Sequence, residues 1–442
     1  MAAHNPARSA AEAAEAAARR SYGRLIAYLS ARTRDVAGAE DALSEAFASA
    51  LADWPVNGIP HTPEAWLLTV ARRKLIDSAR RAHSGAAAAD VLQLIREMAD
   101  GAGGTGDAGD SGIPDDRLRL MFVCAHPAID RSVRAPLMLQ VILGFDAAAI
   151  ASAFLVSPAA MGQRLARAKN KIRAAGIPFR VPEQNELRER LDVVLDAIYA
   201  VYAEGWSDPL GTETRRRNLA QEGLWLGRLV ASLLPAEPEA LGLLALMLHT
   251  EARREARRNA AGDYVPLAEQ EVTLWNAAMI DEAEALLVEA SRLRVIGRYQ
   301  LEAAVQSAHV VRRRGRSAEV VNGAAGASGA VGPTDAEGAD WAAIESLYRA
   351  LLSLTASPVV AINHAVALAE TRGPQAGLDA LNALADDARL ADYQPYWAAR
   401  AGLLARCKQR DEADQAYERA IGLEADPAVR RFLQQQRAAL LP

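Results

Sequence analysis

The chain has 442 residues, of which 51% are hydrophobic and 24% are charged, and its formal net charge is -5. This length predicts two to three domains, and the many alanines favour a helical chain with sizeable cores. No apolar stretch is long enough and free enough of charge to span a bilayer, and the N-terminus lacks the apolar core of a signal peptide. Two cysteines, Cys124 and Cys407, do not make a disulfide framework, so we expect a cytoplasmic protein.

The charge is unevenly distributed along the chain. Residues 1–178 carry 21 basic and 18 acidic residues, whereas the remainder carries 29 and 37. The first part therefore has a net charge of +3, and its basic residues cluster near 72–81 and 164–173. A negative net charge argues against non-specific nucleic-acid binding, but a local basic patch still binds phosphate because salt screens charges beyond about 8 Å.

Two amphipathic helices are predicted at the start of the chain. The first covers residues 9–32, and its apolar side includes Leu25 and Leu29. The second covers residues 36–54. Its apolar face comprises Ala39, Leu43, Ala46, Phe47 and Ala50. Its opposite, open face is acidic and comprises Glu40, Asp41, Ser44 and Glu45. Such a face suits a basic groove on a partner, although a solvated face is the common alternative.

A third helix is predicted after a loop that is bounded by Pro55 and Pro63. Its period places Trp66, Val70 and Ile76 on the inner face. The outer face is then basic and comprises Arg72, Arg73, Lys74, Arg80 and Arg81.

Residues 83–114 interrupt this helical order. Leu92–Met98 is compatible with a short helix, but GAGGTGDAGDSG cannot pack and predicts a flexible linker. The linker is acidic, since no basic residue lies between Arg96 and Arg117.

Helices resume after the linker, over residues 118–125 and 131–143. Asp130 is a suitable cap for the second of these, and Pro136 predicts a kink or a late start.

Residues 145–176 then predict a helix-turn-helix. Asp146 can cap its first helix, and Ser157 followed by Pro158 is a strong start signal for the second. The buried face of the second helix is predicted to comprise Met161, Leu165, Ala168 and Ile172. Its basic residues are Arg164, Arg167, Lys169, Lys171 and Arg173, with no acid among them. Such a helix can lie in a major groove, and taken alone the pattern fits a solvated hairpin equally well.

From Leu187 to the end, the chain predicts an array of short, Ala-rich amphipathic helices. Ala413, Tyr417, Ala420 and Pro427 match half of a tetratricopeptide (TPR) pattern, and a weaker copy lies near residues 363–384. A disordered loop is predicted near residues 315–339.

The sequence offers little support for catalysis or for a metal. Cys124 and His126 lie two residues apart, but a metal site needs three or four ligands and no other Cys or His is near them. His249 and His364 lie in apolar helical stretches, where packing is the simpler role. We find no phosphate-binding glycine loop and no nucleophile motif, so we expect no enzyme activity, no cofactor and no metal.

Taken in order, these segments resemble a bacterial RNA polymerase sigma factor of the sigma-70 family, in the extracytoplasmic-function (ECF) group. AEDALSEAFASAL (39–51) resembles the helix that docks on the polymerase clamp, and AWLLTVARRKLIDSARR (65–81) resembles the helix of the -10 element. LRLMFVCAHPAI (118–129) and residues 150–179 resemble the -35 domain. YAVYAEGW (199–206) resembles the start of the C-terminal TPR-like extension that one subgroup carries.

The resemblance implies a role for each segment. Glu40, Asp41, Ser44 and Glu45 would bind polymerase. Asn57, His61, Trp66, Arg72, Arg73, Lys74, Arg80 and Arg81 would contact the -10 element, with Trp66 either stacking on a base or lying in the core. Gln163, Arg164 and Arg167 would read bases of the -35 element, and Lys169, Lys171 and Arg173 would contact phosphates.

The predicted protein is therefore all-α. Its parts are a core-docking and -10 domain (9–82), a flexible acidic linker (83–114), a -35 domain (115–178) and a TPR-like extension (187–442). Its expected function is that of an alternative sigma factor, with core RNA polymerase and promoter DNA as partners. The extension would modulate activity through contacts within the chain or with other proteins. The alternative is an ordinary helix-turn-helix regulator with a TPR-like sensor domain.

Overall fold

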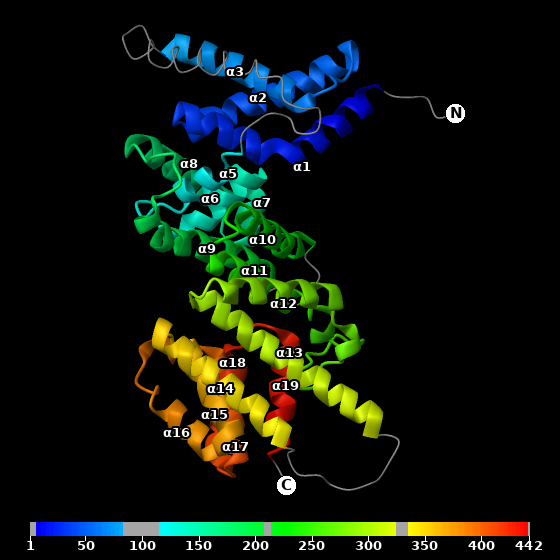
Figure 1. Cartoon of the computed structure of the whole chain (residues 1–442), viewed down its shortest axis with the longest axis vertical. Helices are drawn as coiled ribbons and strands as arrows, with labels where there is room; N and C mark the ends of the chain where they lie inside the picture. Colours follow the sequence, from blue (N-terminus) through cyan, green and yellow to red (C-terminus); the bar gives the residue numbers. More distant parts are fainter. Residues whose placement is uncertain (1–5, 83–114, 155, 207–213, 324–334, 441–442) are drawn as a thin grey trace, which may run out of the picture. The chain divides into compact units, whose positions relative to one another are not determined.

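The computed structural model describes residues 6–82, 115–154, 156–206, 214–323 and 335–440. The described parts are helical, as the sequence predicts (Figure 1), and their one isolated β-bridge joins Arg258 to Tyr264. No described helix is both long enough and apolar enough to cross a membrane. The predicted linker at 83–114, with its possible short helix at Leu92–Met98, lies outside the described residues.

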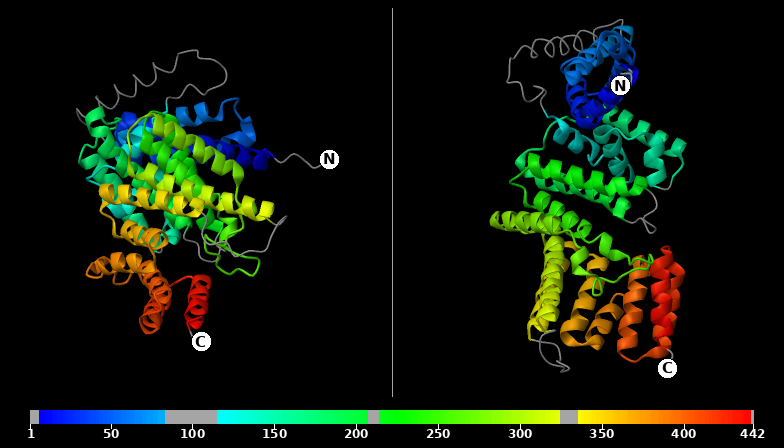
Figure 2. Two further views of the ribbon diagram at one scale, coloured as in Figure 1. Left: turned by 60° about the horizontal axis from the view of Figure 1, so that its bottom comes forward. Right: turned by 90° about the vertical axis from the view of Figure 1, so that its right-hand side faces the viewer.

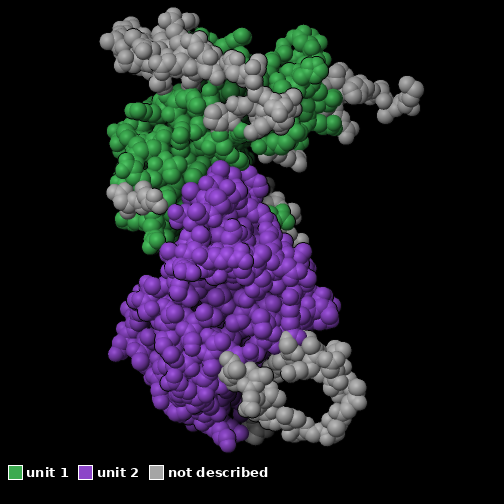
Figure 3. Space-filling view, viewed as in Figure 1, with its two compact units in different colours: residues 1–206, 214–223 green, residues 207–213, 224–442 purple. Residues whose placement is uncertain are grey.

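The chain divides into two compact units (Figure 3). Unit 1 comprises residues 1–206 and 214–223, and unit 2 comprises residues 207–213 and 224–442. The helices of unit 1 are α1 (Pro6–Thr33), α2 (Val36–Asn57), α3 (Pro63–Ala82), α5 (Arg117–Cys124), α6 (Arg131–Leu143), α7 (Ala147–Ala153), α8 (Pro158–Ala174) and α9 (Gln184–Trp206). Helix α10 (Thr214–Leu233) begins in unit 1 and ends in unit 2.

Helices α1, α2 and α3 pack against one another and are seen nearly end-on in the right-hand view of Figure 2. Leu25 and Leu29 of α1 are fully buried, as the sequence predicts. The side chain of Asp35 caps α2 by accepting a hydrogen bond from the backbone N–H of Gly38, at 3.1 Å. Helix α2 runs through Pro55 and ends at Asn57, and it is capped by Gly58, whose φ of 88° lies in the left-handed region that favours glycine. It is therefore longer than predicted, and the following loop is shorter.

The inner face of α3 differs from the prediction. Its buried residues are Leu67, Leu68, Ala71 and Leu75, whereas Trp66, Val70 and Ile76 are only half-buried. Helix α3 packs on both α1 and α2, so these two helices determine which of its residues are buried. The buried stripe is displaced by one residue from the predicted stripe.

Helix α1 also packs against α5 and α6. Gly23 lies so close to α6 that a Cβ atom there would be 2.1 Å from the carbonyl oxygen of Ile142. Gly144 ends α6 with a φ of 75°, and an added Cβ would lie 3.0 Å from the ring of Tyr22. These two close contacts require glycine and hold α1 tightly on α6.

Helix α6 confirms the predicted cap and corrects the prediction for its start. The Asp130 carboxylate accepts a hydrogen bond from the backbone N–H of Ser132, at 2.8 Å. The helix begins at Arg131 and continues through Pro136, so the expected late start is wrong. Pro136 falls within the second turn, close to the helix start, where few backbone hydrogen bonds are lost.

Helix α9 is part of unit 1 and packs against α5 and α6. Its buried residues include Leu191, Leu195 and Ile198, and Arg190 donates a hydrogen bond to the carbonyl of Phe122, at 3.0 Å. The predicted extension boundary at Leu187 therefore falls inside a helix that covers the core of unit 1.

Unit 2 continues as an all-helical array. Its α-helices after α10 are α11 (Pro238–Glu251), α12 (Ala277–Arg292), α13 (Arg298–Gly323), α14 (Asp335–Thr355), α15 (Pro358–Arg372), α16 (Pro374–Asn382), α17 (Gln394–Arg406), α18 (Arg410–Leu423) and α19 (Pro427–Ala438). Short 3-10 helices occur at Glu255–Arg257, Val272–Leu274 and Ala388–Leu390. Neighbours in sequence from α13 to α19 pack on each other, and one apolar core joins α15 to α19.

The residues that match the TPR pattern are either buried or located at the start of a helix in this array. Ala413, Tyr417 and Ala420 are buried on one face of α18, and Pro427 is the first residue of α19. The predicted disordered loop at 315–339 is wrong at both ends, because α13 continues to Gly323 and α14 begins at Asp335. Residues 324–334 lie outside the described residues.

Candidate functional site

The acidic face predicted on α2 is only partly open. Asp41, Ser44 and Glu45 are exposed. Glu40 is only 8% exposed, so the expectation that it lies on the open face is wrong. On α2, Glu40 lies beside Ala39 and Leu43. An element that packs on these two residues therefore also covers Glu40.

Glu40 forms an ion pair with Lys169 of α8. Its Oε2 lies 2.5 Å from the Lys169 Nζ, and the two side chains are 10% and 15% exposed. Burial raises the pKa of the Glu40 carboxyl, and the charge and hydrogen bond of Lys169 act in the opposite direction. The predicted polymerase-binding helix is thus joined to the predicted DNA-reading helix through two of the predicted site residues.

A second ion pair joins the same two helices. Arg173 Nη1 of α8 lies 3.4 Å from the Oδ2 of Asp35, which is also the N-cap residue of α2. This pair is more exposed than the first, so water and salt screen it more strongly.

Helices α7 and α8 form the predicted helical pair. Asp146 accepts a hydrogen bond from the N–H of Ala149, at 2.6 Å, and Ser157 accepts one from Ala160, at 3.2 Å. Pro158 occupies the first position of α8. The buried residues of α8 are Met161, Leu165, Ala168 and Ile172, which confirms the predicted face.

The remaining polar residues of α8 are not equivalent. Gln163, Arg164 and Arg167 are exposed, and so is Lys171. The Arg167 Nε donates to the backbone carbonyl of Gln163, at 3.3 Å, which keeps these two residues together. An exposed amide and two guanidinium groups can read base edges, whereas Lys169 is occupied by Glu40.

The basic face of α3 is also less open than predicted. The Arg72 guanidinium donates to the hydroxyl of Tyr28, and Arg32 lies 3.5 Å above the same ring. Lys74 forms an ion pair with Glu45 of α2, at 3.0 Å. Arg73 is exposed, and the side chains of Arg80 and Arg81 lie outside the described residues. Arg72 is therefore a structural residue here, rather than a free phosphate contact.

The predicted -10 loop has a mixed structure. Asn57 is the last residue of α2, and its amide donates to Asp53, at 2.7 Å. His61 is exposed. Trp66 is half-buried, and its ring packs edge-on against Trp54, with the centroids 5.6 Å apart. Trp66 thus combines a core contact with an accessible edge.

One residue that matters here, Asp116, belongs to no motif in the sequence. Asp116 is 4% exposed and binds both Arg32 (2.8 Å) and Arg119 (2.7 Å), which links α1 to the start of α5. In the sequence, Asp116 lies just after the predicted acidic linker, and only the packing of α1 on α5 shows that it is a fixed contact.

Cys124 and His126 lie in different surroundings. Cys124 is fully buried, and the Nδ1 of His126 accepts a hydrogen bond from the N–H of Ala128, at 3.1 Å. Within the described residues, no three His, Cys, Asp or Glu side chains are grouped to hold a metal ion.

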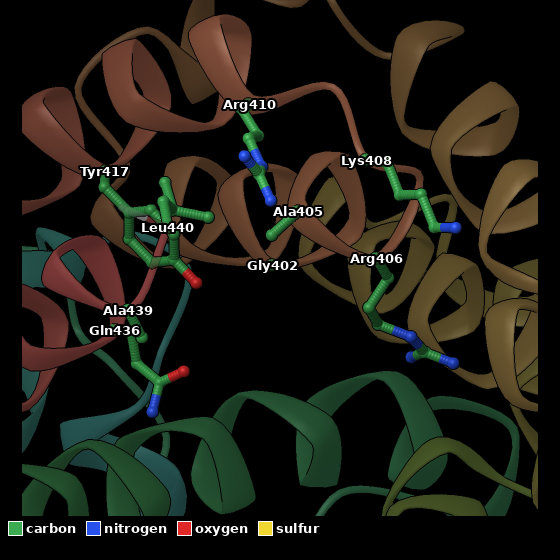
Figure 4. Close-up of a pocket in the computed structure, with 9 residues that line it drawn as sticks. All are labelled: Gly402, Ala405, Arg406, Lys408, Arg410, Tyr417, Gln436, Ala439 and Leu440. Carbon is green, nitrogen blue, oxygen red and sulfur yellow. The ribbon is translucent and has the colours of Figure 1, made fainter. Parts of the chain in front are cut away.

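Unit 2 has an open groove of about 940 Å³ between α17, α18 and α19 (Figure 4). The lining residues are Gly402, Ala405, Arg406, Lys408, Arg410, Tyr417, Gln436, Ala439 and Leu440. Three of these nine are basic and none is acidic. Arg406 is paired with Glu370 at 2.5 Å, which reduces the positive charge that the groove offers.

Comparison with known proteins gives four findings. Residues 17–85 match Sigma-70 region 2, and residues 190–291 match a family of unknown function, DUF6596. The chain is also 37% identical, over 415 residues, to an uncharacterized protein of Rhizobium meliloti (strain 1021), covering 94% of this chain and 92% of that protein. No solved structure matches the chain.

Proposed function

The chain belongs to the same family as the uncharacterized Rhizobium meliloti protein and contains a sigma-70 region 2, so we propose that it is an alternative RNA polymerase sigma factor of the ECF group. A sigma-70 region 2 indicates a role in polymerase binding and promoter recognition. Proteins of the sigma-70 family are transcription initiation factors without enzyme activity. The observation that carries the proposal is this match, which begins within α1 and covers α2 and α3.

In this function, α2 binds the core polymerase. Asp41 and Ser44 remain exposed, and Glu45 is exposed beside Lys74. Exposed carboxylates attract a basic surface and raise the rate of encounter. Arg73 and His61 are the exposed candidates for contact with the -10 element, and the free edge of Trp66 is suited to a base.

Helices α7 and α8 are then the reader of the -35 element. The exposed Gln163, Arg164 and Arg167 are suited to base edges, with about 1–3 kcal/mol of discrimination for each good bidentate contact. Lys171 is exposed and suited to a phosphate.

The C-terminal helices would modulate this activity. The match to DUF6596 begins in α9 and ends in α12, and the TPR-like pattern follows in α17 to α19. Residues 179–442 carry a net charge of -8, which favours contact with a basic surface. Deleting residues 234–442 should change transcription from a cognate promoter, and unchanged transcription and core binding would make this domain a passive scaffold.

The proposal is tested with the full chain and core polymerase. The chain should bind the core enzyme and start transcription from genomic DNA without another sigma factor. Asp41→Lys should weaken core binding by about tenfold, a loss of about 1.4 kcal/mol, because it reverses an exposed charge on α2. Glu289→Lys makes the same charge change on the exposed side of α12 and should leave binding unchanged.

The alternative, a helix-turn-helix regulator with a TPR-like sensor, predicts different results. Such a protein would bind DNA but would need a separate sigma factor to start transcription. Transcription that appears only when another sigma factor is added would favour this alternative.

A further inference from the structure

We propose that the groove between α17, α18 and α19 binds a short acidic segment of another protein, in which carboxylates flank an apolar side chain. The groove has a volume of about 940 Å³, and all the residues that line it belong to unit 2 (Figure 4). The site is therefore separate from the sigma-70 region 2 and exists whether or not unit 1 acts in transcription.

The cations of the groove are suited to carboxylates. Arg410 is the first residue of α18, Lys408 lies in the turn before it, and both are exposed. Within the described residues, neither side chain has a hydrogen bond or an ion pair. Arg406 lies on the neighbouring wall, where Glu370 holds its guanidinium at 2.5 Å. Because no acid lines the groove, Lys408 and Arg410 are left for a negatively charged ligand.

Tyr417 is a second, independent indication of a ligand. The residue is only 5% exposed, and its hydroxyl oxygen points into the groove in Figure 4. In the part of the chain that the structure describes, this hydroxyl has no hydrogen-bond partner. Burial raises the pKa of Tyr417, so the hydroxyl keeps its proton and can donate to a carboxylate oxygen.

The remaining lining residues are mostly small or apolar. Gly402 and Ala405 belong to α17, whereas Ala439 and Leu440 follow α19. A peptide backbone can approach such a surface closely, and an apolar side chain between the carboxylates can pack on Leu440. The amide of Gln436 can form hydrogen bonds with the peptide backbone.

The wall formed by α19 is held by a loop from the segment that matches DUF6596. Arg258 Nη2 lies 2.6 Å from the Oδ2 of Asp426, which is the N-cap residue of α19. The rings of Tyr264 and Phe432 pack edge-on, with their centroids 5.5 Å apart. None of these four residues lines the groove, so α19 is held from outside it. A wall that is already fixed lowers the cost of ordering the site when a ligand binds.

A peptide fits these features better than a nucleic acid does. Residues 179–442 carry a net charge of -8, so a long polyanion is repelled by the rest of this part of the chain, whereas a short acidic segment meets mainly the local cations. Among the described residues that line the groove, the one aromatic side chain is Tyr417, and its ring is buried in the core. The groove therefore lacks an exposed ring on which a base could stack.

Fluorescence anisotropy with the full chain and labelled synthetic peptides tests the site. The probes are short peptides that carry several Asp or Glu residues around one Leu or Phe, the same peptides with Asn and Gln in place of the acids, and a single-stranded DNA. The acidic peptides should bind with a Kd below about 100 µM, and the neutral peptides about tenfold more weakly. Added salt should weaken the binding of the acidic peptides, because the contacts are ionic.

Substitutions identify the residues that bind the peptide. Lys408→Gln and Arg410→Gln should each weaken the binding of acidic peptides about threefold. Tyr417→Phe should weaken it about fivefold, because a hydrogen bond to a carboxylate is lost while the ring keeps its packing. Its thermal unfolding should match that of the parent, since the hydroxyl has no partner within the described residues. Arg292→Gln on α12 removes an exposed cation outside the groove and should leave binding unchanged.

Three results would overturn the proposed peptide site. They are a Kd above about 1 mM for every acidic peptide, an equal loss of affinity in Arg410→Gln and Arg292→Gln, and unchanged affinity when Lys408→Gln and Arg410→Gln are combined. Single-stranded DNA that binds more tightly than the peptides, and is weakened by Arg410→Gln, would overturn it as well and assign the groove to nucleic acid. The sigma-factor assignment is decided separately, by core binding and transcription.

Discussion

The contact between Glu40 and Lys169 changes the functional interpretation of both residues. Each lies in a charged stretch that predicts a binding face, and each is buried by the other. Arg72 is a similar case, because its guanidinium is bound to Tyr28. Residues of the same type a few positions away, such as Arg73 and Lys171, remain exposed and available.

Gly23 is the residue that best tests the packing of α1 on α6. Gly23→Ala should destabilise unit 1 by about 1–3 kcal/mol, because the added Cβ meets the backbone of Ile142 and forces the helices apart. Gly162→Ala in α8 is the control, since nothing lies within 4 Å of its added Cβ. It should stabilise the helix by about 0.5–1 kcal/mol. Urea unfolding followed by circular dichroism measures both, and equal effects would contradict the packing described.

His249 should make unit 2 sensitive to acid. It is fully buried, neither ring nitrogen makes a hydrogen bond, and its Nε2 lies 3.5 Å from a Glu284 oxygen. Burial, with the charges of Arg253 and Arg314, lowers the pKa of His249 to about 4 and outweighs the nearby carboxylate. The folded state therefore favours neutral imidazole. Its contribution is fully present above pH 6.5, where the unfolded chain is also neutral, and is lost as the pH falls towards 4.

His249→Leu removes this titration and should flatten the pH dependence of unfolding. Between pH 7 and pH 5, the parent should lose about 2 kcal/mol more stability than the variant. Thermal unfolding at several pH values measures the difference. His61→Gln removes an exposed histidine and should leave the parent's slope unchanged. The same acid-induced loss in His249→Leu would show that another group is responsible.

At the scale of single helices, α8 follows from its sequence and α3 does not. Ser157, Pro158 and the apolar residues at helical spacing determine the start of α8 and its buried face. Helix α3 contains apolar residues on several adjacent sides, so more than one stripe is compatible with its sequence. Its contacts with α1 and α2 select the stripe that contains Leu67, Ala71 and Leu75.

The exposed face of α8 leads to a prediction about specificity. Changing Gln163, Arg164 and Arg167 together to Ala should reduce the preference for the cognate -35 sequence, because base contacts are lost. Lys171→Ala should weaken binding to all sequences alike and reduce the salt dependence by about one ion. Binding of the polymerase complex to cognate and altered promoters at several salt concentrations separates the two. An equal loss on all promoters for both variants would place the groove face elsewhere.

At the scale of the whole molecule, the division of the chain differs from the expected one. The resemblance to sigma factors predicts an extension from residue 187, but α9 covers α5 and α6 in unit 1. Gly223 of α10 also belongs to unit 1, and an added Cβ there would lie 2.8 Å from Tyr202 of α9. The sigma-like part and the start of the extension are therefore packed as one unit.

This packing predicts how truncated chains behave. A chain of residues 1–186 should aggregate or unfold easily, because it loses α9 and exposes the apolar surface that Leu191, Leu195 and Ile198 cover. A chain of residues 1–233 keeps α9 and should unfold at a higher temperature than the 1–186 chain. Size-exclusion chromatography and thermal unfolding compare the two. A 1–186 chain as stable as the 1–233 chain would show that α9 is dispensable to unit 1.

The sequence by itself determined the helical class, the caps at Asp130 and Ser157 and the buried face of α8, because these depend on residues within a turn or two of each other. The sequence also identifies the sigma-70 region 2, because that match depends on the order of residues along α1 to α3. The tertiary structure alone decided that Glu40 is buried against Lys169, that Arg72 binds Tyr28 and that α9 belongs to unit 1. These contacts join residues 44 to 129 positions apart in the chain, and no local period or propensity records which distant side chain will cover a given face.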